Sequence, residues 1–287
     1  MTALVSIILP VLNGGAWLDL AVASILHQTY QKWELLIIDD GSTDGAPQRV
    51  AGIIDPRVNV IIDGENRGLA ERLNEGVAMA KGELIARMDA DDISFPDRIT
   101  QQVYFLQNNP KIDLLGTSGV IFNEQGKSVC MMRIRIKHQD LVAQPWRGIP
   151  IPHPTWMGRR EWFQRYRYRN PEVRRAEDQE LLLRAYPDSQ FACLDEPLFG
   201  YRQGQFNFRT RWIERRYLLA FQVEIFWVRK EYLNLALATL FTGLKLIAYS
   251  FAAVGIGRQY SSSQEAGDDT VNRFYEALKS AKTLSIT

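Results

Sequence analysis

The stretch LIARMDADD, at residues 84–92, joins an apolar run to a group of three carboxylates. The run at 84–88 has the composition of a buried strand, and SFPD at 94–97 predicts a turn that opens a helix. Carboxylates at a strand end are hard oxygen ligands, which suit Mg²⁺ or Mn²⁺. A divalent cation there would stabilise a diphosphate as a leaving group. An Asp-x-Asp triplet alone is more often an exposed acidic loop. Other features of the chain are therefore needed to distinguish a metal site from such a loop.

Apolar runs and amphipathic patterns alternate through the first half of the chain. Strands that are apolar throughout, with helices between them, predict an α/β fold whose mainly parallel central sheet is covered by helices on both faces. The other predicted strands are Val5–Leu9, closed by Pro10, and residues 35–38 and 58–62, and the predicted helices are residues 18–26 and 69–80.

Polar residues follow each of the four predicted strands. Asn13 follows the first strand, Asp39 and Asp40 the second, Asn66 and Arg67 the third, and Asp89 and Asp91 the fourth. Ligands of parallel α/β sheets bind beyond the carboxyl ends of the strands. These four groups are therefore expected to share one rim of the sheet and to form a single site.

Charge is unevenly distributed along the 287 residues, although the net charge is only +1. Residues 1–130 carry a net charge of −7, and residues 131–232 carry +7. The basic middle section predicts an anionic partner: phosphates, acidic lipid or nucleic acid. The chain does not start with a charged segment followed by a cleavable apolar core, so a cytoplasmic location is expected.

The rim motifs resemble, in order, those of the family 2 glycosyltransferases, which have the GT-A fold. The similar segments are VSIILPVLN at 5–13, LIIDDGSTD at 36–44, NRG at 66–68, MDADD at 88–92 and RAEDQEL at 175–181. The Gln-x-x-Arg-Trp motif of the processive members is not evident, because residues 209–212 are RTRW. Polymer synthesis is therefore not expected.

The resemblance implies a role for each rim residue. Asp40, or its neighbour Asp39, would accept a hydrogen bond from the nucleotide base, and Asn66 and Arg67 would border the nucleoside. The alternative for these segments is ordinary turn and loop structure, since Asp-Gly-Ser is good turn chemistry. The other donor-site positions implied are Pro10 and Asn13 from the first motif, Asp89 at the ribose and metal, Asp91 at the metal, and a cofactor of Mn²⁺ or Mg²⁺.

Asp178 is the general base implied by the resemblance, in a transfer that inverts the anomeric carbon. It precedes the apolar run at residues 181–183, which predicts a helix, and a position near a helix N-terminus favours a charged carboxylate. The alternative is a carboxylate that serves only the helix. His153 and Glu177 are further candidates near the acceptor or the phosphates. Arg202 is a candidate clamp for the diphosphate through charge-assisted hydrogen bonds.

The C-terminal region, residues 209–287, is predicted to be a helical extension that follows a GT-A domain at residues 1–208. Residues 233–257 are mostly apolar and long enough to span a bilayer, but Lys245 at mid-membrane would cost about 3 kcal/mol. Two short helices on the membrane surface, aided by flanking arginines, explain the pattern as well. A buried helix of a soluble domain is the third alternative.

Together these features predict a metal-dependent hexosyltransferase that uses a nucleotide sugar, with UDP as the first choice. The expected partners are this donor, a saccharide or lipid-linked acceptor and the cytoplasmic membrane surface, and no nucleic acid. Two other functions remain. A sugar nucleotidyltransferase would need a glycine-rich, basic N-terminal loop, which residues 10–13 do not form. A non-catalytic binding or scaffold protein would not need Asp178.

Overall fold

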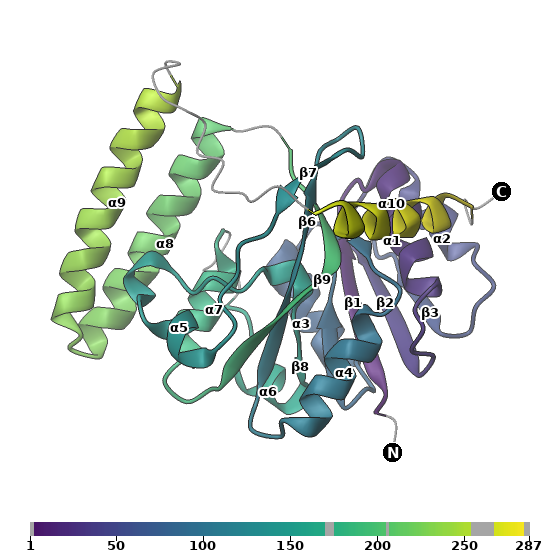
Figure 1. Ribbon diagram of the computed structural model, residues 1–287, viewed down its shortest axis with the longest axis horizontal. Coiled ribbons are helices and arrows are strands. Elements are labelled where there is room, and N and C mark those ends of the chain that lie inside the picture. Colours follow the sequence, from purple (N-terminus) through teal and green to yellow (C-terminus); the bar gives the residue numbers. More distant parts are fainter. Residues whose placement is uncertain (1–2, 170–174, 205–206, 254–266, 284–287) are drawn as a thin grey trace.

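The computed structural model of the protein describes residues 3–169, 175–204, 207–253 and 267–283. One nine-stranded sheet forms its centre, with helices on both faces and a helical hairpin beside it (Figure 1). The strands are β1 (Val5–Val11), β2 (Trp33–Asp39), β3 (Val58–Ile61), β4 (Leu84–Arg87), β5 (Ile93–Ser94), β6 (Leu114–Phe122), β7 (Ser128–Met131), β8 (Met157–Arg159) and β9 (Phe191–Arg202). The helices are α1 (Gly15–Leu26), α2 (Ala46–Ala51), α3 (Leu69–Met79), α4 (Arg98–Asn108), α5 (His138–Val142), α6 (Arg160–Arg165), α7 (Glu177–Ala185), α8 (Phe208–Val228), α9 (Tyr232–Ala253) and α10 (Asp268–Thr283), with 3-10 turns η1 (Pro145–Arg147) and η2 (His153–Thr155).

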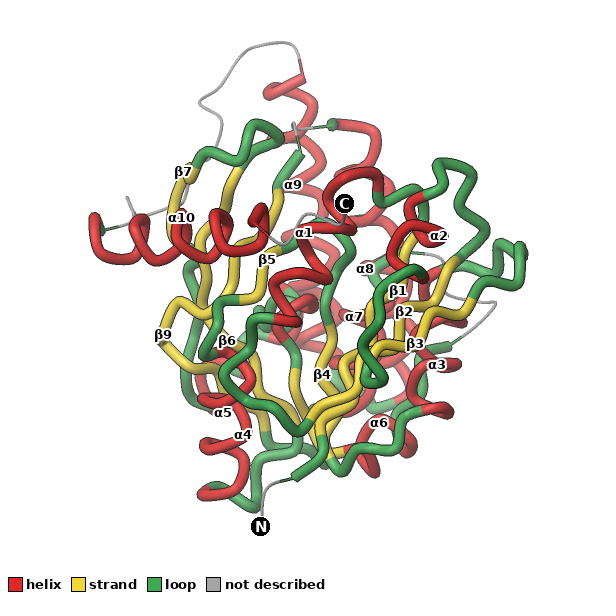
Figure 2. The backbone as a smooth tube through the Cα atoms, turned by 90° about the vertical axis from the view of Figure 1, so that its right-hand side faces the viewer, coloured by secondary structure: helices red, strands yellow, loops and turns green. Residues whose placement is uncertain are grey.

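The strand order is β3-β2-β1-β4-β8-β6-β9-β5, and β7 pairs with β6 (Figure 2). Strands β1 to β4 are mutually parallel, and β6 is parallel to β9, whereas β8 is antiparallel to both β4 and β6. The predicted α/β class with a mainly parallel sheet is confirmed. Because β1 to β4 run in one direction, the segments that follow them all leave the sheet at the same rim.

Strand β1 continues through Pro10 to Val11, two residues beyond its predicted end. Pro10 is paired with Ile38 of β2. Because a proline has no N–H, it would break the hydrogen bonding of the sheet if its nitrogen faced a paired strand. The Ile8 carbonyl accepts from Met88 on the β4 side, and alternate residues of a strand face the same neighbour. Pro10 therefore faces the β4 side, beyond the last β1–β4 pair at Ile8 and Arg87, where no ladder bond is lost.

The core lies in two layers because successive side chains of β1 point to opposite faces of the sheet. Ile7 belongs to the same buried cluster as residues of α1 and α4, while Ile8 belongs to the cluster that includes residues of α3 and α7. Both side chains are almost fully buried. Helices on both faces thus hold the strand ends at fixed positions.

The C-terminal helices differ in where they pack. Helices α8 and α9 lie side by side as a hairpin next to the sheet, whereas α10 returns to it (Figure 1). Phe274 of α10 is fully buried, with its ring 5.1 Å from that of Phe122 and 6.5 Å from that of Phe95. The division of the chain at residue 208 stays a prediction, and α10 packs with the sheet although it follows that boundary.

Helix α9 is one continuous helix through Gly243 and not the pair of short helices considered from the sequence. Only 11% of the stretch Tyr232–Phe251 is buried, so it is not a core helix either. Among the described residues, this is the one helix long and apolar enough to cross a membrane. Residues 254–257 of the predicted apolar stretch lie outside the described residues.

Candidate active site

The first two strand ends are joined by hydrogen bonds around Asn13. Its backbone N–H donates to Ser42 Oγ at 2.8 Å, and its Oδ1 accepts from the Thr43 N–H at 2.9 Å. Asn13 has a φ of +55°, a left-handed conformation that asparagine tolerates better than most residues. Asn13 therefore fixes the loop after β1 against the loop after β2. Pro10, by contrast, is buried within β1 and offers no exposed group.

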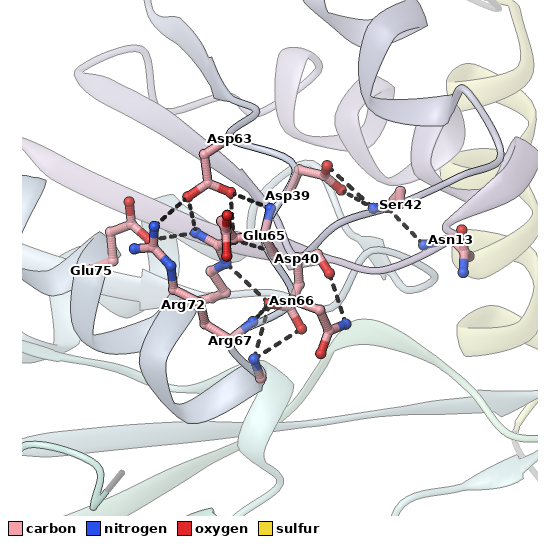
Figure 3. Close-up of polar contacts among 11 residues, drawn as sticks. Asn13, Asp39, Asp40, Ser42, Asp63, Glu65, Asn66, Arg67, Arg72 and Glu75 are labelled. Carbon is pink, nitrogen blue, oxygen red and sulfur yellow. Dashed lines mark hydrogen bonds and ion pairs between the residues drawn. The ribbon is translucent and has the colours of Figure 1, made fainter. Parts of the chain in front are cut away.

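Asp39 and Asp40 are both buried at the end of β2, and both carboxylates accept backbone hydrogen bonds (Figure 3). Asp39 accepts from the N–H of Ser42 at 3.0 and 3.3 Å, which closes the turn. Asp40 Oδ1 accepts from the N–H of Arg67 at 2.7 Å and that of Gly68 at 3.0 Å. The carboxylates thus organise the loops. Within the described residues Asp40 Oδ2 accepts only the 3.1 Å bond from Gly68, so it keeps capacity for a further donor.

Arg72 of α3 completes this network, and the sequence did not identify it. The guanidinium is fully buried and donates to Asp40 at 3.1 Å, to Asp63 at 2.7 and 2.9 Å, and to Glu75 at 2.9 Å (Figure 3). The available sequence signal was an arginine on the apolar side of a predicted helix, four residues after the NRG motif. Arg72 holds the loop after β3 against the end of β2.

Asn66 and Arg67 lie on the exposed side of the same loop. Asn66 Nδ2 donates to the Asp40 carbonyl at 2.9 Å, and Arg67 pairs with Asp63 at 3.0 Å. Figure 3 shows Asn13 linked through Ser42 to Asp39, and Asn66 and Arg67 bonded to the adjacent Asp40. The structure therefore brings the first three polar groups of the sequence together.

The fourth group, at the end of β4, is an acidic cluster. Asp89, Asp91 and Asp92 each offer one carboxylate oxygen, and these atoms lie within 4.8 Å of one another. Opposite ligands of a Mg²⁺ ion lie about 4.2 Å apart, so a small inward movement would let all three bind one ion. Asp92 Oδ2 is buried without a hydrogen-bond partner among the described residues. Oxygen donors at this spacing, one of them unpartnered, fit a hard divalent cation.

Arg202, at the end of β9, lies against this cluster. Its guanidinium donates to Asp91 Oδ2 at 2.7 and 3.1 Å, and its backbone N–H donates to Asp92 Oδ1 at 2.8 Å. The guanidinium also lies 5.4 Å from the centre of the Trp17 ring. A cation that binds Asp91 would compete with Arg202, which would then be free to reach a neighbouring anion.

Burial and charge crowding dominate the electrostatics of the cluster. Burial raises the pKa of Asp92 well above its ordinary value, and the neighbouring Asp89 and Asp91 raise it further. Burial also raises the pKa of Asp89, against the attraction of Arg87 at 2.6 Å. A cofactor metal would neutralise the crowded negative charge of this cluster.

Arg87 of β4 is a second residue that the sequence did not identify. It is buried, and its Nε and Nη1 atoms have no hydrogen-bond partner among the described residues. Burial opposes its charge, but the nearby Asp89, Tyr168 and Glu177 outweigh burial, so the pKa of Arg87 is raised. Its place in a strand of otherwise apolar residues, directly before the carboxylates, was the only sequence signal. The Arg87 guanidinium partly neutralises the negative charge of the acidic cluster.

Asp178 lies in the first turn of α7, as predicted. Ala176, just before the helix, has a φ of +56°, a conformation that is uncommon for any residue but glycine. Asp178 Oδ2 accepts from Gln179 Nε2 at 3.1 Å. Burial raises the pKa of Asp178 although the hydrogen bonds from Gln179 lower it, and burial followed by the charge of Asp178 raises the pKa of Glu177.

A pocket of about 680 Å³ is lined by residues from the end of strand β4 and from the start of helix α7. Its walls include Asp89, His153, Glu177 and Asp178, and it is bordered by α8 and by Tyr249 of α9. The candidate metal ligand and the candidate base therefore face the same space, although they are 89 residues apart in the chain.

His153 is held within η2, and not presented as a free base. Its Nε2 lies 2.7 Å from the Tyr168 hydroxyl, and its ring centre lies 4.4 Å from that of Trp156. Burial, followed by the charge of Arg87, lowers the pKa of His153 well below its ordinary value. A neutral imidazole at the pocket wall can orient a neighbouring group by hydrogen bonding.

Comparison with known proteins identifies the family. The model of glycosyl transferase family 2 matches residues 6–167, more than half of the chain. The chain belongs to glycosyl transferase family 2. This confirms the relationship predicted from the motifs, and the protein is a family 2 glycosyltransferase.

Individual relatives agree with this assignment. EpsE of Bacillus subtilis is 33% identical over 213 residues, which cover 72% of this chain and 76% of EpsE. WfgD of Escherichia coli, a UDP-Glc:α-D-GlcNAc-diphosphoundecaprenol β-1,3-glucosyltransferase, is 32% identical over 133 residues, which cover 46% of this chain and 53% of WfgD.

Solved structures share the fold at lower sequence identity. Staphylococcus aureus TarS 1–349 in complex with UDP-GlcNAc matches with a TM-score of 0.62 and 17% identity, over 99% of this chain and 81% of the TarS 1–349 chain. The mannosyltransferase PcManGT of Pyrobaculum calidifontis, in complex with GDP-Man and Mn²⁺, matches with a TM-score of 0.60 and 19% identity, over 99% of this chain and 87% of that protein. These matches support the GT-A fold.

Proposed function

We propose that the protein transfers a hexose from a UDP-sugar to a hydroxyl of a saccharide or lipid-linked glycan, with inversion at the anomeric carbon. The observation that carries this proposal is the shared pocket: Asp89 of the acidic cluster and Asp178 of α7 line it together. The structures of TarS with UDP-GlcNAc and PcManGT with GDP-Man support a nucleotide-sugar donor. WfgD supports a lipid-linked acceptor.

The nucleoside would bind at the rim formed by the ends of β2 and β3. Asp40 Oδ2 has capacity for a donor such as a base N–H, and Asn66 and Arg67 border that position on the exposed side. Asp39 and Asn13 keep the surrounding loops in place. Backbone-anchored carboxylates are rigid acceptors, so the site loses little conformational freedom when the nucleotide binds.

The acidic cluster would hold Mn²⁺ or Mg²⁺ through Asp91 and Asp89, with Asp92 as the third oxygen donor. When bound, the metal would neutralise the diphosphate of the donor. Arg202 would move from Asp91 to the diphosphate oxygens, where charge-assisted hydrogen bonds stabilise the negative charge that develops as UDP departs.

Asp178 is the proposed general base. The acceptor oxygen forms a bond to the anomeric carbon, the bond from that carbon to the diphosphate breaks, and Asp178 takes the acceptor hydroxyl proton. Its raised pKa makes Asp178 a stronger base than an exposed aspartate. Glu177 and His153 line the same wall and would orient the acceptor hydroxyl.

The α8–α9 hairpin would attach the protein to the cytoplasmic face of the membrane. Leu233, Leu240, Leu244, Ile247 and Phe251 are each more than half exposed, and at 100° per residue they lie on one face of α9. Lys245 lies on another face, 5.6 Å from the centre of the Phe241 ring. An apolar stripe on one face fits a helix that lies on the membrane surface better than one that spans it.

The test is metal-dependent turnover of a panel of nucleotide sugars. We expect one UDP-hexose to raise the melting temperature of the protein in a thermal-shift screen with Mn²⁺. We also expect the protein to release UDP from this UDP-hexose when Mn²⁺ is present. Asp91→Asn should abolish this release, whereas the control Asp195→Asn, at an exposed position of β9, should not change it. Equal turnover by Asp91→Asn and wild type, or full turnover in EDTA, would refute the proposed metal site.

A further inference from the structure

Three cations gather around one aromatic ring where α8, α9 and η1 meet. The Phe241 ring centre lies 5.0 Å from the Arg147 guanidinium carbon, 5.4 Å from that of Arg215 and 5.6 Å from Lys245 Nζ. Each cation lies within cation–π distance of the ring, and positive side chains gathered in one region create a potential that attracts anions. We call Arg147, Arg215 and Lys245 the Phe241 cluster.

No carboxylate neutralises the two arginines within the described part of the chain. Arg147 donates to Gln144 Oε1 at 3.0 Å, a neutral acceptor, and stacks 5.1 Å from the Trp146 ring. Arg215 Nη1 is buried and has no hydrogen-bond partner among the described residues. An unpartnered buried guanidinium N–H carries a desolvation cost that an anionic ligand would remove.

Arg147 and Arg215 line the same pocket as Asp178. Hydrogen bonds also hold η1 and the segment after it to both neighbouring helices: Gln222 of α8 donates to the Pro145 carbonyl at 3.0 Å, and Gln179 of α7 bonds to Ile149 at 2.9 and 3.1 Å. Gln179 is the residue that donates to Asp178. The Phe241 cluster is therefore held at a defined position relative to the proposed base.

We propose that the Phe241 cluster binds a phosphate or diphosphate group of the acceptor, so that the attached sugar presents its hydroxyl to Asp178. This inference rests on the proposed function and specifies the acceptor as a phosphorylated one. Asp39, Asp40 and Asn66, which form the proposed nucleoside site, do not line this pocket. The exposed apolar stripe of α9 lies on the same helix as Lys245, so a lipid carrier bonded to the phosphate could enter the membrane beside it.

The experiment measures binding of three probes by calorimetry: farnesyl diphosphate, inorganic diphosphate and farnesol. Farnesyl diphosphate should bind and farnesol should not. Arg147→Gln and Arg215→Gln should each weaken diphosphate binding by about 10- to 100-fold, since hydrogen bonds to charged groups are of that strength. Arg216→Gln is the matched control, because Arg216 adjoins Arg215 on α8 but stacks on Trp212.

The probes distinguish the sources of the phosphate. Tighter binding of farnesyl diphosphate than of inorganic diphosphate assigns the site to a lipid-linked acceptor, and equal binding assigns it to a soluble phosphorylated one. The inference is overturned if no diphosphate probe binds, if both arginine variants bind like Arg216→Gln, or if saturating UDP with Mn²⁺ displaces the probe. Affinity for UDP with Mn²⁺, measured in the same variants, should stay unchanged, and its absence in the wild type would instead contradict the proposed donor function.

Discussion

Replacing Asp178 by asparagine should separate catalysis from binding and from folding. Asparagine keeps the shape of the side chain and its carbonyl oxygen can still accept from Gln179, but it cannot take a proton at neutral pH. General-base catalysis contributes about 10²- to 10⁴-fold, which corresponds to roughly 3–5 kcal/mol of the activation barrier. We expect transfer to fall by that factor while the affinity for the UDP-sugar stays nearly constant.

Removing a carboxylate that stabilises the fold lowers the melting temperature, but we expect Asp178→Asn not to lower it. The folded-state pKa of Asp178 is raised above the ordinary value of about 3.9, so ionisation at neutral pH costs folding free energy, which is recovered only at lower pH. The helix N-terminus offsets about 0.3–1 kcal/mol of that cost. Asp178→Asn should therefore melt at the wild-type temperature or slightly above it.

The assay is single-turnover transfer, measured beside a melting curve, with Asp188→Asn as control. Asp188 follows the same helix, and its side chain is 65% exposed. A capping role predicts that both turnover and stability survive, because asparagine caps helices as well as aspartate does. If Asp178→Asn transfers sugar within about threefold of wild type, outside the range of general-base effects, the base is another residue and Glu177 becomes the next candidate.

Other consequences can be tested separately. The acid limb of the transfer rate against pH should lie above the ordinary aspartate pKa, because activity is lost as pH falls through the raised pKa of Asp178, and a limb near pH 4 would contradict this. Asp40→Ala should weaken UDP binding even in EDTA and lower the free energy of unfolding by about 1–3 kcal/mol, because buried donors lose their acceptor; calorimetry and urea unfolding measure the two effects. The double variant Leu240→Asp and Leu244→Asp should reduce flotation with anionic vesicles by about 100-fold or more, whereas Ile54→Asp, at another exposed apolar position, should not, and equal flotation would exclude α9 as the contact.

Local sequence determined the first four strands, the start of α7 and the residues at the rim. The apolar runs of β1, β2 and β4 are buried throughout, and a strand of this kind is recognisable from consecutive side chains alone. Because parallel strands end at one edge, the polar groups that follow them were predicted to be neighbours. The hydrogen bonds among Asn13, Asp40 and their adjoining loops show that the first three groups meet.

Only the tertiary structure decided which distant groups meet at the site. Arg202 lies 111 residues from the carboxylate of Asp91 that it pairs with, and Arg72 of α3 binds Asp40, 32 residues away. The return of α10 to the sheet and the gathering of cations around Phe241 have no local pattern at all. Periodicity records which face of one element is buried, whereas partners across elements depend on strand order, on register and on where loops close, and none of these is encoded by neighbouring residues.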